Sequence, residues 1–142
     1  MPVKKEVLLK VRGTQTHAWG EQDSIEFVTE GQLFSRDNSY YILYNESALA
    51  GMEGITTSLK VEPTRVILNR MGTAEHKATF EEGVLSDGFY VTPYGTMKLS
   101  ILPSKVEVHL TDAGGSINLE YELQVGYERV SYNQLEITVS SI

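Results

Sequence analysis

Hydrophobic and polar residues alternate along most of the chain with a period of two. In the first segment Val7, Leu9 and Val11 share one parity, whereas Glu6 and Lys10 share the other. Successive side chains of a β-strand point to opposite faces, so this alternation predicts a strand with one buried face. Further segments follow the same pattern, at 25–33, 55–61, 97–101, 105–110, 117–125 and 135–140.

Turn-forming residues separate these segments at short intervals. Glycine, proline, asparagine and aspartate gather at 36–39, 62–64, 81–83, 93–95, 102–104, 112–115 and 125–127. Glycine tolerates positive φ and proline fixes φ near −65°, so both favour chain reversal. Short links of this kind predict successive antiparallel hairpins. Helical periodicity is nearly absent, and only 45–54 could form a turn of helix.

Together these elements predict one all-β domain that spans residues 1–142. About ten strands with one apolar face must bury that face, and closing the sheet on itself does so while removing exposed edges. Only the connection at 45–54 is long enough to cross between two sheets. The hairpin order therefore favours a single antiparallel up-and-down (meander) β-barrel over a sandwich.

Composition excludes several classes of function. The 142 residues include 12 Lys and Arg against 19 Asp and Glu, giving a net charge of −7, and no cysteine. Without cysteine there is no disulfide, no thiolate nucleophile and no cysteine-based metal site. An acidic chain repels phosphate backbones, so we expect no nucleic-acid partner. Many of the acidic residues fall on the polar parity and form a solubilising outer face.

Targeting and membrane segments are not expected. A basic pair near the start is followed by a three-residue apolar run that Lys10 interrupts, far short of the ~7–15 apolar residues of a secretory signal. No segment approaches the ~18 apolar residues of a membrane-spanning helix. The sequence therefore predicts a cytoplasmic protein with no membrane partner.

Five motifs give the chain a family resemblance. They lie at 5–15, 46–57, 70–72, 90–95 and 114–121. In this order and spacing they resemble the YwiB-like bacterial family, a domain of unknown function with a calycin-like (lipocalin-like) β-barrel. The resemblance covers nearly the whole chain and implies a barrel in a bacterial cytoplasmic setting, with no assigned activity. The lipocalin Gly-x-Trp signature is missing, because Gly20 follows Trp19 instead of preceding it. Lipocalin ligand chemistry is therefore not carried over.

Arg70 is the most informative charged residue. It shares the parity of Val66 and Leu68, which predicts that its side chain points into the barrel. An unpaired buried charge is very costly, so an inward arginine requires an anionic partner. That partner is either a ligand carboxylate or phosphate, or an acidic side chain at the rim. A cation–π contact with Trp19 is a further alternative.

Other candidate ligand contacts lie near the longest connection and one turn. Residues 51–54 could cover the barrel mouth with Glu53 as a polar anchor, or could simply be a glycine-flanked loop. Residues 92–95 predict a tight hairpin turn, whose tyrosine could stack on a ligand. The predicted ligand-binding residues are Tyr44, Glu53, Thr57, Arg70 and Tyr94.

Catalytic and metal-binding patterns are not found. The three histidines, His17, His76 and His109, have no spacing typical of a metal site, and no Gly-x-Ser-x-Gly motif occurs. Adjacent Glu81 and Glu82 would point in different directions, which does not suit paired-carboxylate catalysis. We therefore expect neither an enzyme nor a metal or other cofactor.

Two functions stay open. The first is a non-enzymatic barrel that binds a small apolar or anionic ligand in its interior or mouth. The second is a filled barrel that acts as a protein-interaction module or homodimer, through exposed Leu8, Val28 and Phe34. The state of the interior distinguishes them. The large residues predicted to point inward are Phe27, Leu33, Tyr44, Leu59, Phe89, Met97, Leu99 and Tyr121.

Overall fold

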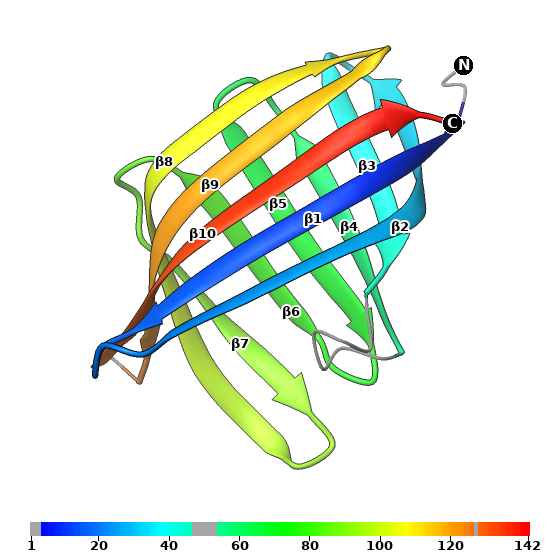
Figure 1. The fold of residues 1–142 in the computed structure, drawn as a ribbon. Coiled ribbons are helices and arrows are strands. Elements are labelled where there is room, and N and C mark those ends of the chain that lie inside the picture. The colour runs from blue at the N-terminus through cyan, green and yellow to red at the C-terminus, as the bar shows by residue number, and fades with distance from the viewer. Residues whose placement is uncertain (1–3, 47–53, 127) are drawn as a thin grey trace.

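Ten β-strands follow one another along the chain in the computed structural model, which describes residues 4–46, 54–126 and 128–142 (Figure 1). Over these residues no helix occurs, so the all-β prediction is confirmed. The predicted helical turn at 45–54 falls mostly on residues outside the described ranges. The strands are β1 (Lys5–His17), β2 (Gln22–Arg36), β3 (Ser39–Asn45), β4 (Ile55–Val61), β5 (Arg65–Gly72), β6 (His76–Glu81), β7 (Ser86–Thr92), β8 (Gly95–Thr111), β9 (Gly114–Val125) and β10 (Glu128–Ser141).

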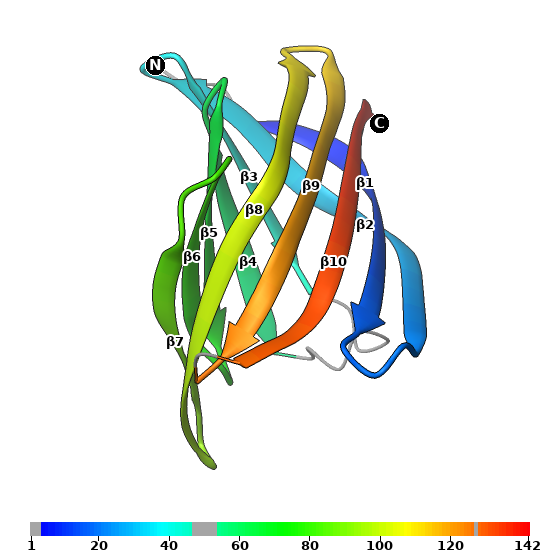
Figure 2. The same ribbon diagram turned by 90° about the vertical axis from the view of Figure 1, so that its left-hand side faces the viewer.

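All ten strands form one sheet, in the order β6-β5-β4-β3-β2-β1-β10-β9-β8-β7. Every pair is antiparallel, and β1 also pairs with β10, which brings the two chain ends together (Figures 1 and 2). This order confirms the predicted meander. The sheet curls until its end strands β6 and β7 meet, so the barrel is nearly closed.

The junction between β6 and β7 is the weakest part of the barrel wall. Glu75 and Val91 exchange two backbone hydrogen bonds of 2.9 Å, and the Thr79 amide donates to Ser86 Oγ at 3.2 Å. Gly88 allows the two backbones to approach, because a Cβ there would lie 2.7 Å from the Lys77 carbonyl oxygen. The junction therefore depends on close packing more than on a regular ladder.

Strands β2 and β3 are paired along only part of the length of β2. β2 pairs with β3 only from Gly31 to Arg36, whereas its earlier residues pair with β1 alone. The early part of β2 thus diverges from β3 towards the barrel end that carries the 46–54 connection. We call this the Arg70 end, and the end with the β2–β3 and β8–β9 turns the opposite end.

The middle of the barrel is filled by its own side chains. Residues from nine of the ten strands are almost wholly buried there, among them Leu9, Ile42, Leu59, Phe80, Ile117, Leu119 and Ile137. Inner-face residues nearer the two ends keep accessible surface, including Phe27, Tyr121, Leu123 and Leu135, and Tyr40, Val108 and Leu110. The interior is therefore packed at its centre and accessible at its ends.

Two residues predicted to point inward do not fill the barrel. Phe89 is 60% exposed, because it lies on the face of β7 opposite to Tyr90. Met97 is 47% exposed although it pairs with Tyr90, because the β7–β8 hairpin extends beyond the barrel end (Figures 1 and 2). Alternation gives the relative faces of neighbouring residues, but it does not show where a hairpin extends beyond the wall.

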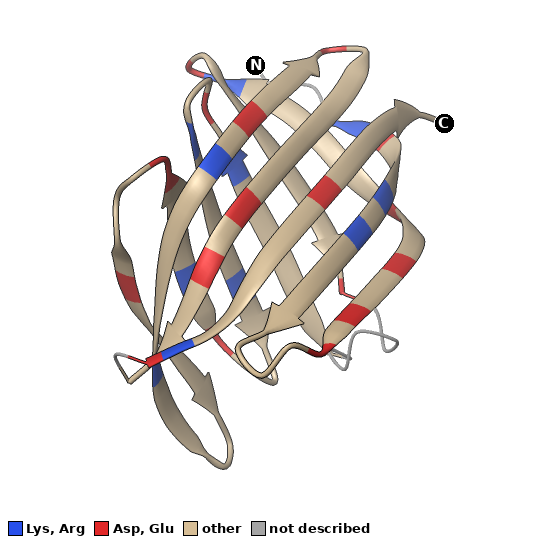
Figure 3. Ribbon diagram, turned by 60° about the vertical axis from the view of Figure 1, so that its left-hand side comes forward, with Lys and Arg blue, Asp and Glu red and all other residues tan. Residues whose placement is uncertain are grey.

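Charged residues are spread along the strands and turns of the barrel wall (Figure 3), and most of those in the described ranges are exposed. Glu26 contacts Lys10 at 3.2 Å and Arg12 at 3.1 Å, and Lys105 contacts Glu120 at 3.4 Å. These exposed pairs contribute little to stability. In the described part of the chain, no helix has the length and apolar character needed to cross a bilayer.

Candidate functional site

A row of polar side chains crosses the inner face of four consecutive strands. Tyr44 on β3 lies opposite Thr57 on β4, Thr57 lies opposite Arg70 on β5, and Arg70 lies opposite His76 on β6. Directly opposed residues of antiparallel strands have Cβ atoms ~5 Å apart, so these side chains are neighbours. With Glu46, which follows β3, we call them the polar cluster.

Arg70 and Glu46 form a buried ion pair in this cluster. Arg70 Nε lies 3.6 Å from Glu46 Oε2, and the two side chains are 20% and 4% exposed, respectively. The Thr57 hydroxyl donates a short hydrogen bond to the same Glu46 oxygen. Their formal charges cancel, which explains how both ions are tolerated inside the barrel. The prediction that Arg70 points inward is confirmed, and its partner is an acidic side chain.

Burial keeps two titratable members of the cluster neutral. Burial and the negative charge of Glu46 raise the pKa of the Tyr44 hydroxyl well above its usual value. Burial and the positive charge of Arg70 lower the pKa of His76 to about 4. At pH 7 the cluster therefore holds one cation, one anion, a neutral imidazole and a protonated phenol.

Two buried nitrogen atoms in the cluster lack a hydrogen-bond partner in the described part of the chain. Neither Arg70 Nε nor His76 Nδ1 has a hydrogen-bond partner among the residues that the structure describes. Most buried polar atoms in proteins are hydrogen-bonded, so each exception calls for an explanation. His76 itself is 6% exposed and makes an edge contact with the Tyr90 ring at 5.9 Å. Each of these two nitrogens can therefore form a hydrogen bond with a ligand or a water molecule.

The facing wall adds hydroxyl and amide groups. Tyr121 on β9 packs edge-on against Phe80 of β6 at 5.0 Å and lies within the electrostatic reach of Arg70. Its partner in the sheet, Asn133, donates to Ser131 Oγ at 3.0 Å, and Gln15 donates to the same oxygen at 3.1 Å. Polar groups thus contribute to the inner face on both walls.

The structure brings together three of the five predicted ligand-binding residues: Tyr44, Thr57 and Arg70. Glu53 lies outside the described residues. Tyr94 is 99% exposed at the turn of the β7–β8 hairpin, so it lies apart from the polar cluster, and its contact with a ligand stays a prediction. Its turn extends past the barrel end, away from the inner face (Figure 1).

Sequence reasoning missed Glu46 and His76 as members of the site. His76 shares the parity of buried Ala78 and Phe80, a signal that its ring faces inward. Glu46 shares the parity of Tyr44 but follows the last residue of the strand, where alternation no longer fixes direction. Its position depends on the Glu46 amide, which donates to the Ile55 carbonyl oxygen at 2.8 Å.

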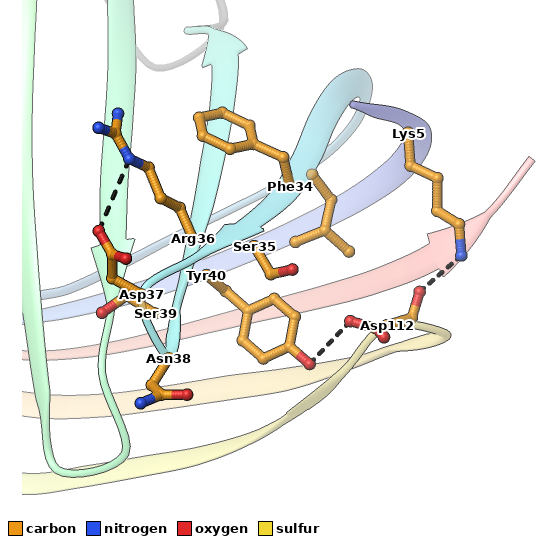
Figure 4. A pocket seen from close by; sticks show the side chains of 10 residues that line it. Lys5, Phe34, Ser35, Arg36, Asp37, Asn38, Ser39, Tyr40 and Asp112 are labelled. Carbon is orange, nitrogen blue, oxygen red and sulfur yellow. Dashed lines mark hydrogen bonds and ion pairs between the residues drawn. The ribbon is translucent and has the colours of Figure 1, made fainter. Parts of the chain in front are cut away.

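A separate pocket of about 890 Å³ lies at the opposite end of the barrel (Figure 4). It is lined by Lys5, the β2–β3 hairpin from 33 to 40, and Asp112. Tyr40 donates to Asp112 Oδ1 at 3.0 Å, which raises the pKa of the Tyr40 hydroxyl, and Lys5 Nζ donates to the Asp112 carbonyl oxygen at 2.7 Å. These hydrogen bonds join the β2–β3 and β8–β9 hairpins across the barrel mouth. The polar groups that form them therefore stabilise this end of the barrel.

The described residues contain no cluster of metal-ligating side chains. In residues 4–46, 54–126 and 128–142, no three His, Asp or Glu side chains come close enough to hold an ion together.

Comparison with known proteins places the fold in a family. The family model described as "Domain of unknown function (DUF1934)" matches residues 9–137. The chain belongs to this family. A curated relative, the "Uncharacterized beta-barrel protein YwiB" of Bacillus subtilis (strain 168), is 27% identical over 119 residues, covering 84% of this chain and 82% of that protein.

The crystal structure of the ywiB protein from Bacillus subtilis matches with a TM-score of 0.88 and 23% identity, over 98% of this chain and 93% of that one. At this identity the likeness supports the barrel fold alone. The resemblance to the YwiB-like family is confirmed, whereas neither relative's name states a ligand or a partner.

Proposed function

We propose that this member of the DUF1934 family is a non-enzymatic barrel that binds a small anionic molecule at the polar cluster. The observation that carries the proposal is the inward guanidinium of Arg70, whose Nε has no hydrogen-bond partner among the described residues. Charge-assisted hydrogen bonds from arginine to carboxylate or phosphate oxygens are among the strongest in proteins. An anionic oxygen beside Nε would satisfy this donor.

The filled middle of the barrel limits the size of the ligand. Leu9, Ile42, Phe80 and Ile117 are each 0–1% exposed, so a long apolar chain has no room to extend past the cluster. Of the apolar and anionic ligands considered from the sequence, the packing favours a compact anion.

Access to the cluster comes from the Arg70 end. The Arg70 side chain keeps 20% of its surface exposed although its Nε is buried, so the side chain reaches from the interior towards solvent. Inner-face Phe27, Tyr121 and Leu123 are also partly accessible, and β2 does not pair with β3 before Gly31. A small molecule entering at this end would meet Arg70 first.

Thermal-shift screening tests this function. The purified chain is screened against a panel of small carboxylates, phosphates and lipids, and native mass spectrometry shows any molecule that co-purifies. We expect at least one compact anion to raise the melting temperature of the wild type but not of Arg70→Gln. Arg65→Gln is the matched control, because Arg65 lies on the same strand but pairs with Glu62 and is 42% exposed.

The result that would sink the proposal is an apo mass together with no thermal shift for any compact anion. Stabilisation that persists in Arg70→Gln would place the binding elsewhere and would also contradict it. The Arg65→Gln variant separates loss of a specific contact from a general change in net charge.

A second function is favoured by the exposed apolar surface of the β7–β8 hairpin. Phe89, Val91, Tyr94 and Met97 are all exposed there, and the hairpin extends beyond the barrel. Such a surface suits self-association or a protein partner. We expect light scattering to show a dimer that Phe89→Ser with Met97→Ser dissociates. A monomer at all concentrations would exclude the homodimer.

The patch predicted from sequence supports association less well. Leu8 and Val28 are exposed but lie opposite Glu30 and Lys10 in the sheet. Phe34 stacks on Tyr41 at 5.0 Å, with the Lys4 ammonium over its ring. Charged neighbours thus divide these three residues into separate contacts.

A further inference from the structure

We infer that the molecule bound at the polar cluster is an oxyanion that carries its own hydroxyl group, such as hydrogen phosphate or a 2-hydroxycarboxylate. This inference rests on the proposed function and adds a requirement to it. The anionic oxygen accepts a hydrogen bond from Arg70 Nε, and the ligand hydroxyl donates to His76 Nδ1.

The two unsatisfied nitrogens are placed to contact one ligand. Arg70 and His76 are direct partners in the β5–β6 register and both face the interior. Side chains in such a pair lie ~5 Å apart at Cβ, a separation that one small molecule can bridge. Arginine has only donors, so it requires an acceptor on the ligand.

His76 supplies the complementary group. A neutral imidazole has one N–H donor and one acceptor nitrogen, whereas a protonated imidazole has only donors. Burial and the charge of Arg70 keep this ring neutral, because they lower the pKa of His76 to about 4. With the proton on Nε2, Nδ1 is a buried acceptor that has no hydrogen-bond partner among the described residues.

Glu46 makes a ligand hydroxyl still more favourable. Its carboxylate already neutralises Arg70 at 3.6 Å and accepts from Thr57. An anion without a donor would lie near this carboxylate and could form no hydrogen bond to it, and like charges repel strongly in a buried site. A ligand hydroxyl offers a proton to the acceptors that Glu46 and His76 provide.

Two matched pairs of probes test the inference directly. At pH 7 inorganic phosphate keeps at least one hydroxyl, whereas sulfate of nearly the same shape has none. Likewise 2-hydroxypropanoate carries a hydroxyl that propanoate lacks. Each probe is titrated into the isotopically labelled protein, and the Arg70 Nε–Hε and His76 ring signals are followed by NMR.

We expect the hydroxyl-bearing member of at least one pair to bind about tenfold or more tightly than its partner, the loss typical of one unmade buried hydrogen bond. The phosphate and hydroxycarboxylate arms identify which oxyanion the site accepts. The ring nitrogen shifts of His76 in the free wild type should show a neutral imidazole with the proton on Nε2.

Variants test whether His76 causes the difference in affinity between the two members of each pair. His76→Phe keeps a flat ring without the acceptor, so it should bind phosphate no better than sulfate. If His76→Phe does not fold, the wild-type ring shifts decide, since a proton on Nδ1 would overturn the inference. Arg70→Gln should bind neither member of either pair.

Equal binding of phosphate and sulfate, and of the two propanoates, would overturn the hydroxyl requirement. If that equal binding still depended on Arg70, the proposed anion-binding function would stand. No binding of any probe overturns the inference. The wider thermal-shift panel would then decide the proposed function independently.

Discussion

His76 should make the free energy of unfolding of this barrel depend on pH, and His76→Gln should remove that dependence. The imidazole is buried beside Arg70 on β5 and Tyr90 on β7. Its pKa falls from 6.5 to about 4 in the folded state. Below pH 6.5 the unfolded chain therefore binds a proton at His76 that the folded chain does not.

The sign follows from proton linkage. Stability rises with pH wherever the unfolded state binds more protons, so the folded state loses stability as the pH falls from about 6.5 to about 4. A pKa difference from 6.5 to about 4 corresponds to about 3 kcal/mol over this window. Below about pH 4 both states are protonated and His76 adds no further slope.

Urea unfolding at pH 7, 6, 5 and 4 measures the effect in the wild type and in His76→Gln. Carboxylates titrate in both proteins, so the difference between their pH slopes isolates His76. We expect the wild type to lose about 3 kcal/mol more than His76→Gln between pH 7 and pH 4. Parallel pH slopes in the two proteins would refute a buried, neutral His76.

Three further predictions test other parts of the structure. Gly88→Ala should cost about 1–3 kcal/mol in urea unfolding, because its Cβ would lie 2.7 Å from the Lys77 oxygen. Gly13→Ala should cost clearly less, because the atom nearest to its Cβ, on Ile25, lies 3.5 Å away; equal losses would contradict the close β6–β7 junction. Arg70→Gln should destabilise the barrel by about 3 kcal/mol in urea unfolding, because it leaves the buried Glu46 carboxylate without its partner; a loss no larger than that of the exposed Arg65→Gln would argue against the ion pair. Tyr40→Phe and Asp112→Asn should each cost about 1 kcal/mol, with a double variant that costs less than their sum; additive losses would mean that their hydrogen bond contributes nothing.

The barrel could be predicted from the sequence because one buried face forces a period of two on every strand. Alternation in 117–125 and 135–140 gave the inward faces of β9 and β10 correctly, with Ile117, Leu119 and Ile137 buried. The same rule placed Arg70 inside through its parity with Val66 and Leu68. The turn residues predicted that neighbouring strands form hairpins. The succession of hairpins then predicted the meander.

The candidate site could be predicted only in part, because it depends on register and on strand ends. Tyr44, Thr57 and Arg70 are neighbours through the pairing of β3, β4 and β5, which a single sequence does not give. Glu46 follows the end of its strand, where tertiary contacts decide direction. Tyr94 lies apart from the polar cluster on an exposed turn, and nothing in 92–95 shows that the hairpin extends past the wall.

A crystal structure of the protein in the presence of inorganic phosphate would test most directly whether the polar cluster binds a small anion. The account predicts tetrahedral density inside the Arg70 end of the barrel, with one oxygen ~3 Å from Arg70 Nε and another ~3 Å from His76 Nδ1. Density for water alone between Arg70 and His76, in crystals grown at a high phosphate concentration, would contradict it.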